Sequence, residues 1–314
     1  MKNIDKLKFL ETAQDQIINQ VLQGQLVLNR NDEIALLKAL KDQDKGFAPI
    51  QFSVFSNFLS AKSALFSRLA VTYKGKQLTR LVPNFVEVSV YDIALSLTLN
   101  KRAYFSCLSA LYLNQLTVLN PTDLYLNFEQ SEKPRDPNNA ILTQAKADYG
   151  FRRPARTTNN TAEFTYRGTD YRLSFLNGQH TNYLGIGQIA LHDAKQTAFI
   201  ANLERSLIEA MIHPEYCGGV GNVLEAFIMA KDLISITKIL DYLSQINYVY
   251  PYEQALLFYI QRAGYPQQHL HTVRQAIEVR HLNQIKFYLQ HQMINPILDQ
   301  QSQVYFPQAM QENE

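Results

Sequence analysis

The residue patterns that could support cofactor binding or catalysis are few and incomplete. Gly185, Gly187 and Ala190 match the G-x-G-x-x-A spacing of a dinucleotide fingerprint. Glu209 follows near the distance expected for a ribose ligand. That mechanism needs a helix directly after the glycines, so that the pyrophosphate meets the helix N-terminus. The run that follows here, IALHDAKQTAFIA, is typical of a hairpin. We therefore interpret these glycines as structural.

Two further patterns resemble nucleotide sites and lack their essential partners. Residues 217–222, CGGVGN, open a helical run, and glycines at a helix start can cradle phosphate. The Lys and Ser/Thr of a P-loop are absent, so a tight turn between helices is the better interpretation. Asp42 and Asp44 have the D-x-D spacing of a nucleotidyltransferase, but no Gly-Ser pair precedes them.

The histidines and cysteines form no pattern of metal ligands. Zinc needs three or four ligands at defined spacing. The loose histidine group comprises His269, His271, His281 and His291. The two cysteines lie far apart, which favours a reducing cytoplasm over a disulfide framework. We expect no metal, no cofactor and no enzymatic activity.

One basic window is free of acidic residues. No Asp or Glu occurs between Asp44 and Glu87. Because DNA presents a dense line of phosphates, a binding face needs cations without competing carboxylates. The side chains in this window that we expect to contact DNA are Ser60, Lys62, Ser63, Arg68, Lys74, Lys76 and Arg80. The net charge of +2 gives no independent support, so an ordinary solvated surface is the alternative.

The elements around this window predict a winged helix-turn-helix. Periodic apolar residues predict a first helix over residues 5–22 and a second after residue 31. Ser60 is a good N-cap for a further helix that would place Ala64, Leu65 and Leu69 on one face. Residues 78–90 alternate like a hairpin whose turn is Pro83-Asn84.

The rest of the chain predicts a mixed domain. Residues 124–128 form a predicted strand, residues 163–200 a small antiparallel sheet, and residues 202–292 a helical end. We predict an α+β fold, with a helical extension and DNA-binding domain over 1–95, a second domain over 96–300 and a frayed tail over 301–314. The sequence has 314 residues and 46% hydrophobic content. No stretch reaches the roughly 20 apolar residues of a membrane span, and no signal peptide is predicted.

One segment resembles the signature of the AbiEi antitoxin family. Residues 201–219, ANLERSLIEAMIHPEYCGG, follow the family's pattern of an E-R-x-L-[LI]-[DE] helix and a P-E-x-x-G-G turn. Residues 103–116 also resemble its Y-x-S-x-x-S-A-L helix. The motif residues are Glu204, Arg205, Leu207, Ile208, Glu209, Pro214, Glu215, Gly218 and Gly219. The physical pattern is itself readable: Asn202 can cap the helix, and Arg205 can pair with Glu209 one turn later. A purely structural role and contact with a partner both stay open.

The resemblance implies an antitoxin of a type IV toxin–antitoxin (abortive infection) operon. Its winged helix would repress the operon by binding operator DNA. Its C-terminal domain would counteract a nucleotidyltransferase-like toxin, generally without a stable complex. A second basic surface, for which a solvated loop is the alternative, comprises Lys146, Arg152, Arg153 and Arg156. The alternative function is a stand-alone regulator whose C-terminal domain senses a ligand or oligomerises.

Overall fold

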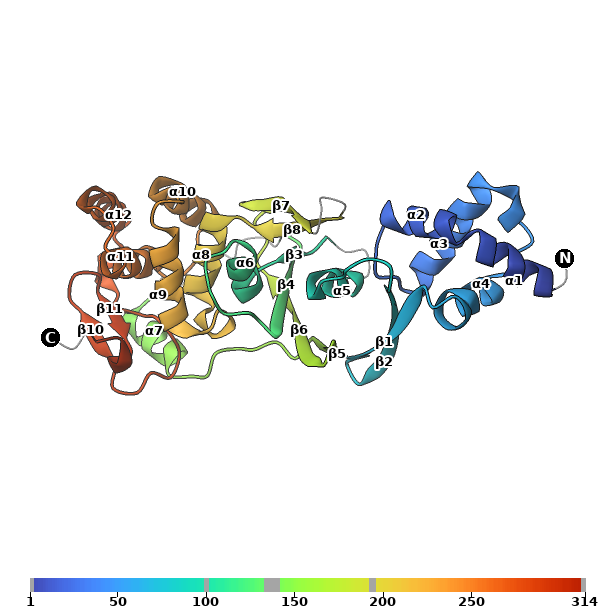
Figure 1. Ribbon diagram of the computed structural model, residues 1–314. Helices are drawn as coiled ribbons and strands as arrows, with labels where there is room; N and C mark the ends of the chain where they lie inside the picture. Colours follow the sequence, from blue (N-terminus) through green and yellow to red (C-terminus); the bar gives the residue numbers. More distant parts are fainter. Residues whose placement is uncertain (1–2, 99–101, 133–141, 192–195, 312–314) are drawn as a thin grey trace. The chain divides into compact units, whose positions relative to one another are not determined.

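The chain forms two compact units, each built from several segments (Figure 1). The computed structural model describes residues 3–98, 102–132, 142–191 and 196–311. Unit 1 comprises Met1–Arg102, Asn160–Leu173 and Gln188–Ala198, and unit 2 comprises Ala103–Asn159, Ser174–Gly187 and Phe199–Glu314. We predicted one boundary near residue 95. Unit 1 also takes two later segments of the chain, and Ala162 in the first of them pairs with Tyr73.

Unit 1 begins with short helices. Asn29 starts the longest of them, since its side chain accepts from the backbone N–H of Asp32 and the Asp32 side chain accepts from the Asn29 N–H. After α4 the chain makes one π-helical turn, Phe58–Lys62. The helices are α1 (Asn3–Thr12), α2 (Gln14–Leu22), α3 (Arg30–Gln43), α4 (Phe52–Asn57) and α5 (Val90–Ser96).

An antiparallel hairpin follows the helices and corrects two sequence predictions. Strands β1 (Phe66–Tyr73) and β2 (Lys76–Pro83) pair in register from Phe66↔Pro83 to Tyr73↔Lys76. Lys74 and Gly75 both have positive φ, 50° and 73°, which suits the two-residue turn of a twisted hairpin. The helix predicted to begin at Ser60 and the hairpin predicted over 78–90 are therefore wrong. The turn lies at Gly75, eight residues before the predicted Pro83-Asn84.

The helices and the hairpin share one apolar core. Leu28 and Leu81 exchange two backbone hydrogen bonds of 2.9 Å, so the segment before α3 pairs with β2. Leu81 belongs to the same buried cluster as residues from each of the preceding helices, among them Leu10, Ile17, Leu37, Phe55 and Phe58. Helices and hairpin are thus held together as one helix–hairpin body.

The strands predicted between residues 163 and 200 exist, but they belong to a larger mixed sheet. Its order is β2-β1-β5-β6-β4-β3-β8-β7. Pairing is antiparallel between β1 and β5 and between β3 and β4, and parallel between β3 and β8. The predicted strand over 124–128 is confirmed as β4. The remaining strands are β3 (Tyr104–Phe105), β4 (Asp123–Glu129), β5 (Thr161–Tyr166), β6 (Thr169–Gly178), β7 (Ile186–Leu191) and β8 (Gln196–Ala201).

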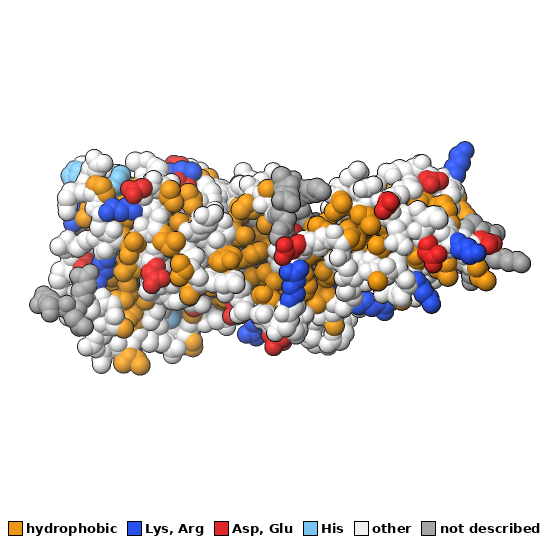
Figure 2. Space-filling model, in the orientation of Figure 1, with side chains coloured by type: hydrophobic (Ala, Val, Ile, Leu, Met, Phe, Trp, Pro, Cys, Tyr) orange, Lys and Arg blue, Asp and Glu red, His pale blue; other side chains and the backbone are white. Residues whose placement is uncertain are grey.

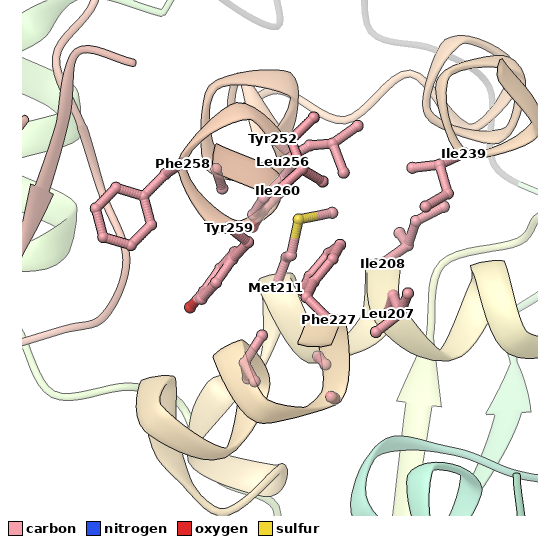
Figure 3. Close-up of a cluster of buried hydrophobic side chains, with 14 of the residues drawn as sticks. Leu207, Ile208, Met211, Phe227, Ile239, Tyr252, Leu256, Phe258, Tyr259 and Ile260 are labelled. Atoms are coloured by element: carbon pink, nitrogen blue, oxygen red, sulfur yellow. The ribbon is translucent and has the colours of Figure 1, made fainter. Parts of the chain in front are cut away.

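Unit 2 packs most of its helices around one hydrophobic core. In Figure 3, Leu207, Ile208 and Met211 of α8 face Phe227 of α9 and Tyr259 of α11. The Phe227 and Tyr259 rings stack with centroids 5.2 Å apart. The helices of this unit are α6 (Cys107–Leu113), α7 (Gln144–Phe151), α8 (Leu203–Ile212), α9 (Gly219–Ala230), α10 (Ile236–Ile246), α11 (Tyr252–Arg262) and α12 (Gln267–Val279).

The α-helices stop before residue 292 and the tail is not wholly frayed, contrary to prediction. The last α-helix ends at Val279. A three-stranded sheet of order β10-β11-β9 follows. Val304 and Phe306 are buried in the core of unit 2, so part of the predicted tail is ordered. The strands are β9 (Phe287–Tyr288), β10 (Ile297–Asp299) and β11 (Val304–Phe306). The predicted α+β class itself is confirmed.

Candidate functional site

Four of the seven residues predicted to contact DNA are exposed cations of the helix–hairpin body. Lys62 ends the π-helical turn, and Lys74 and Lys76 lie at the hairpin turn. Arg68 lies on β1, and its Nη2 donates to the Ser60 Oγ at 3.0 Å. The structure therefore brings Ser60 and Arg68 together, although they were predicted on one helix.

Arg80 is a correction to the predicted set. It pairs with Leu69 across the hairpin and shares the buried face of Leu69 and Val71. Only 4% of Arg80 is exposed, and its Nε donates to the Ser96 backbone oxygen at 3.2 Å. Burial lowers the pKa of Arg80, partly opposed by the charge of Asp32. A side chain held this way cannot reach a phosphate.

Ser63 serves the local backbone. Its Oγ donates to the Phe58 backbone oxygen at 2.8 Å and accepts from the Leu65 N–H at 3.2 Å. These bonds close the turn that leads from the π-helical turn into β1. Ser63 is thus a structural residue of the connection, which sequence spacing could not distinguish from a phosphate contact.

One buried acidic residue of this body, which sequence reasoning missed, interacts with the basic window. Glu33 of α3 is buried, lies within hydrogen-bonding reach of Ser56 and interacts with the charge of Arg68. Burial raises the pKa of Glu33, opposed by the Ser56 hydrogen bond and by the charge of Arg68. The basic window contains no carboxylate in sequence, but the fold brings the carboxyl group of Glu33 close to it. Lys and Arg side chains on the face in Figure 2 are also dispersed among Asp and Glu.

The α8 motif builds a buried polar cluster. Asn202 caps the helix by accepting from the Arg205 N–H at 2.9 Å, as predicted. The predicted pair is present, with Arg205 Nε 2.9 Å from Glu209 Oε1. The Tyr104 hydroxyl also donates to Glu209 Oε1, at 3.1 Å, and Asn127 Nδ2 donates to the Tyr104 hydroxyl. Tyr104 and Asn127 were not predicted as members of this cluster.

The remaining motif residues have structural contacts. Glu204 accepts from Lys238 Nζ at 2.9 Å and from the Ser235 N–H at 3.3 Å, which ties α8 to α10. The hydrogen bond to Glu204 raises the pKa of Lys238. Glu215 is exposed, and His213 Nδ1 lies 3.2 Å from its carboxylate.

The turn after α8 depends on its proline and glycines. Pro214 begins a 3₁₀ turn over Pro214–Tyr216. Gly218 and Gly219 have φ of +79° and +87°, the left-handed region that favours glycine. A Cβ at Gly218 would also lie 2.9 Å from Leu119 Cδ1. These three residues therefore shape the chain reversal before α9.

The second predicted basic surface lies on α7 and the segment after it. Lys146, Arg152, Arg153 and Arg156 are all exposed. The Arg153 guanidinium lies 4.8 Å from the centroid of the Tyr149 ring. Arg156 alone of these four lines a cavity in unit 2, together with the Arg205–Glu209 pair.

That cavity has a volume of about 400 Å³, within the range of small-molecule pockets. Its polar lining includes Ser106, Asn127, Arg205 and Glu209. Three buried polar atoms of these residues have no hydrogen-bond partner among the described residues: Ser106 Oγ, Arg205 Nη1 and Glu209 Oε2. The sequence signalled Ser106 through the Y-x-S-x-x-S-A-L segment and Arg205 and Glu209 through the α8 motif, but it gave no signal for Asn127.

The alternative chemical patterns lack the structural context that their chemistry needs. Strand β7, rather than a helix, follows Gly185, so the fingerprint context is missing. Asp44 accepts from the Gly46 N–H and caps a turn. Cys107 and Cys217 are buried free thiols. Within residues 3–98, 102–132, 142–191 and 196–311, no group of three His, Cys, Asp or Glu side chains is arranged to hold a metal.

Helix length is limited throughout the described chain. Among the described helices, none combines the length and apolar composition needed to cross a bilayer.

Comparison with solved structures shows a shared fold. The chain is similar to the crystal structure of the RV2827C protein from Mycobacterium tuberculosis, with a TM-score of 0.50 and 10% sequence identity. The similarity covers 93% of this chain and 90% of that chain. No family model and no curated protein matches the sequence. At this identity the likeness concerns the fold alone.

Proposed function

We propose that the chain is a non-enzymatic DNA-binding repressor and antitoxin of the AbiEi type. One observation carries the DNA-binding part: Lys62, Arg68, Lys74 and Lys76 are exposed on one helix–hairpin body. The segment that supplies them, residues 45–86, contains no carboxylate. Because phosphate neutralisation supplies most of non-specific DNA affinity, such a body is suited to duplex DNA.

The order of elements supports a winged helix-turn-helix. The order along the chain is α2, the segment around Leu28, α3, α4 with its π-helical turn, and the β1–β2 hairpin. Leu28 pairs with Leu81 of β2. In this proposal residues 52–62 enter the major groove and the hairpin contacts the backbone. The Ser60 hydroxyl already accepts a hydrogen bond from the Arg68 guanidinium. In this proposal Ser60 therefore orients Arg68 toward the duplex and does not contact the bases itself.

The antitoxin part of the proposal rests on the α8 motif and its surroundings. Arg205 and Glu209 form the expected pair, and Pro214, Gly218 and Gly219 form the expected turn. The exposed Arg152, Arg153 and Arg156 offer a second surface for nucleic acid. We propose a functional pairing with a nucleotidyltransferase-like toxin without a stable complex, inside the cytoplasm.

A binding titration tests the DNA-binding half. Fluorescence anisotropy of the full chain with a duplex from upstream of its own gene, at several salt concentrations, should give a linear fall of log affinity with log salt. A scrambled duplex should bind more weakly. Equal affinity for both duplexes, or binding insensitive to salt, would contradict the proposal.

A second experiment tests the antitoxin half. Co-expression of the full chain with the candidate toxin should restore growth. A variant that has lost DNA binding, Lys62→Ala with Arg68→Ala, should still restore it. The full chain is required, because the hairpin pairs with β5 through Tyr73↔Ala162, far along the sequence. No rescue by the full chain would remove the antitoxin half and leave the repressor half.

A stand-alone regulator with a ligand-sensing C-terminal part is the second candidate. The cavity of about 400 Å³ in unit 2 favours it. The neighbouring reading frame discriminates the two candidates, since only the antitoxin requires an adjacent nucleotidyltransferase gene.

A further inference from the structure

The cavity of unit 2 has a buried polar end that protein groups leave incomplete. Arg205 and Glu209 line it, and both side chains are more than nine-tenths buried. Arg205 Nε is used by Glu209 Oε1, which also accepts from Tyr104. Arg205 Nη1 and Glu209 Oε2 have no partner among the described residues. Because a buried polar atom without a partner is unfavourable, a ligand that satisfies both atoms is favoured.

The two free atoms define the ligand's chemistry. They offer one donor and one acceptor from a pair whose charges already neutralise each other. A charged ligand group here would leave an unpaired charge in the interior, which is strongly unfavourable. A neutral edge with an acceptor beside a donor satisfies both atoms. The Watson–Crick edge of a nucleobase has this arrangement, and base-reading pockets bind it by hydrogen bonds.

Aromatic side chains in the wall suit a flat ligand. Tyr216 and Tyr248 both line the cavity. Burial raises the pKa of Tyr248 to about 12, so its phenol is uncharged at neutral pH. Tyr216 is fixed, because its hydroxyl accepts from the Thr158 N–H at 2.8 Å. Stacking of a base on an aromatic ring is favourable and tolerates any base, since every base has a π-face.

The same wall carries a cation for an anionic group. Arg156 lines the cavity, is exposed, and has no ion pair among the described residues. Glu209 is the only carboxylate among the described lining residues, and Arg205 neutralises it. The cavity lining therefore has a net positive charge, and that charge is on Arg156. An arginine in this setting is suited to bind a phosphate.

We propose that this cavity binds a nucleoside monophosphate, with the base edge on Arg205 and Glu209 and the phosphate on Arg156. The ring lies against Tyr216 and Tyr248. The hydroxyl of Ser106, also unpartnered, is available to a further polar atom of the ligand. Binding at this site is independent of the proposed DNA contacts of Lys62 and Arg68.

Isothermal titration of the full chain tests the site with AMP, GMP, CMP and UMP, their nucleosides, and inorganic phosphate. At least one monophosphate should bind saturably. Its nucleoside should bind about tenfold or more weakly, since a charge-assisted phosphate contact contributes more than about 1.5 kcal/mol. Inorganic phosphate alone should bind much more weakly than the monophosphate. If no monophosphate binds at millimolar concentration, or if phosphate binds as tightly, the proposal is wrong.

Variants and a modified ligand test the two ends separately. Arg156→Ala should lose about tenfold in affinity for the monophosphate and little for the nucleoside. Arg153→Ala is the matched control, because Arg153 is exposed nearby and does not line the cavity. Methylation of the ligand's Watson–Crick edge should abolish binding to the unaltered protein, so the buried end is tested without a variant that fails to fold. Equal losses in both arginine variants, or full binding of the methylated nucleotide, would overturn the assignment.

Discussion

Arg205 Nε lies 2.9 Å from Glu209 Oε1, one helical turn away on α8, and the two side chains are only 3% and 7% exposed. Because both side chains are buried, each charge is stabilised by the opposite charge of its partner. The pair is further anchored, since Tyr104 donates to Glu209 and the Asn127 side chain accepts from the Gly178 N–H at 2.8 Å. The motif helix is thereby tied to strands β3, β4 and β6 through buried polar contacts.

Removing either charge should destabilise the protein strongly. Arg205→Met leaves Glu209 as a buried unpaired carboxylate, at an expected cost of about 3–5 kcal/mol in the free energy of unfolding. Glu209→Leu should cost a similar amount. The double variant should be more stable than the sum of the two losses predicts. Urea denaturation of the four proteins measures this coupling, and additive losses would contradict it.

Two glycines of the dinucleotide-like pattern should respond differently to substitution. Gly185 has φ +74°, and a Cβ there would lie 2.7 Å from Tyr242 Cε2 and 2.9 Å from Arg205 Cβ. Gly187→Ala meets no atom within 4 Å. Gly185→Ala should therefore lower the melting temperature, with a cost of about 1–3 kcal/mol from strain and overpacking.

Gly187→Ala is the control and should be close to neutral. A nucleotide-binding glycine loop would instead require both glycines for close backbone approach. If both substitutions lowered NAD(P) affinity without changing the melting temperature, the structural role of Gly185 would be wrong.

The α8 motif could be predicted in detail because its determinants are local. The Asn202 cap, the Arg205–Glu209 pair and the Pro214 stop all depend on residues within one or two turns. Arg80 shows the opposite case. Its burial follows from its pairing with Leu69 across the hairpin, and the register depends on a turn at Lys74-Gly75 that was not recognised.

The cavity could not be predicted for a related reason. Arg156, Asn127 and Glu209 lie far apart in sequence, and only the folded sheet and α8 bring them to one wall. Each has an ordinary local context. Composition and spacing therefore gave Arg156 as one of several basic residues and gave no indication of Asn127.

Substitution of Lys62 and Arg68 should weaken DNA binding, whereas substitution of Arg80 should not. Lys62→Ala with Arg68→Ala should weaken binding to the upstream duplex and reduce the slope of log affinity against log salt by about 2. Lys8→Ala with Lys38→Ala removes the same charge from exposed positions on α1 and α3 and should change the slope little. Equal effects in both double variants would indicate that only net charge matters.

Arg80→Ala should act on stability instead. The side chain donates to the buried Ser96 backbone oxygen and to the Thr79 backbone oxygen, so its removal leaves the buried Ser96 acceptor unpaired at a cost of about 1–3 kcal/mol. At a temperature where the variant stays folded, its salt slope should match that of the unaltered protein. A reduced slope with unchanged unfolding free energy would place Arg80 at the DNA after all.

Glu33 should make the stability of the protein depend on pH. Burial raises its folded-state pKa above the ordinary value of 4.5, so the native state binds a proton more readily than the unfolded chain. The stabilising contribution is complete below the unfolded pKa and is lost as pH rises through the folded pKa. Glu33→Gln keeps the shape and removes the titration, so the variant should lose less stability than the unaltered protein between pH 4 and neutrality. If the unfolding free energies of the variant and the unaltered protein changed in parallel across that range, the pKa of Glu33 in the native state would not be raised.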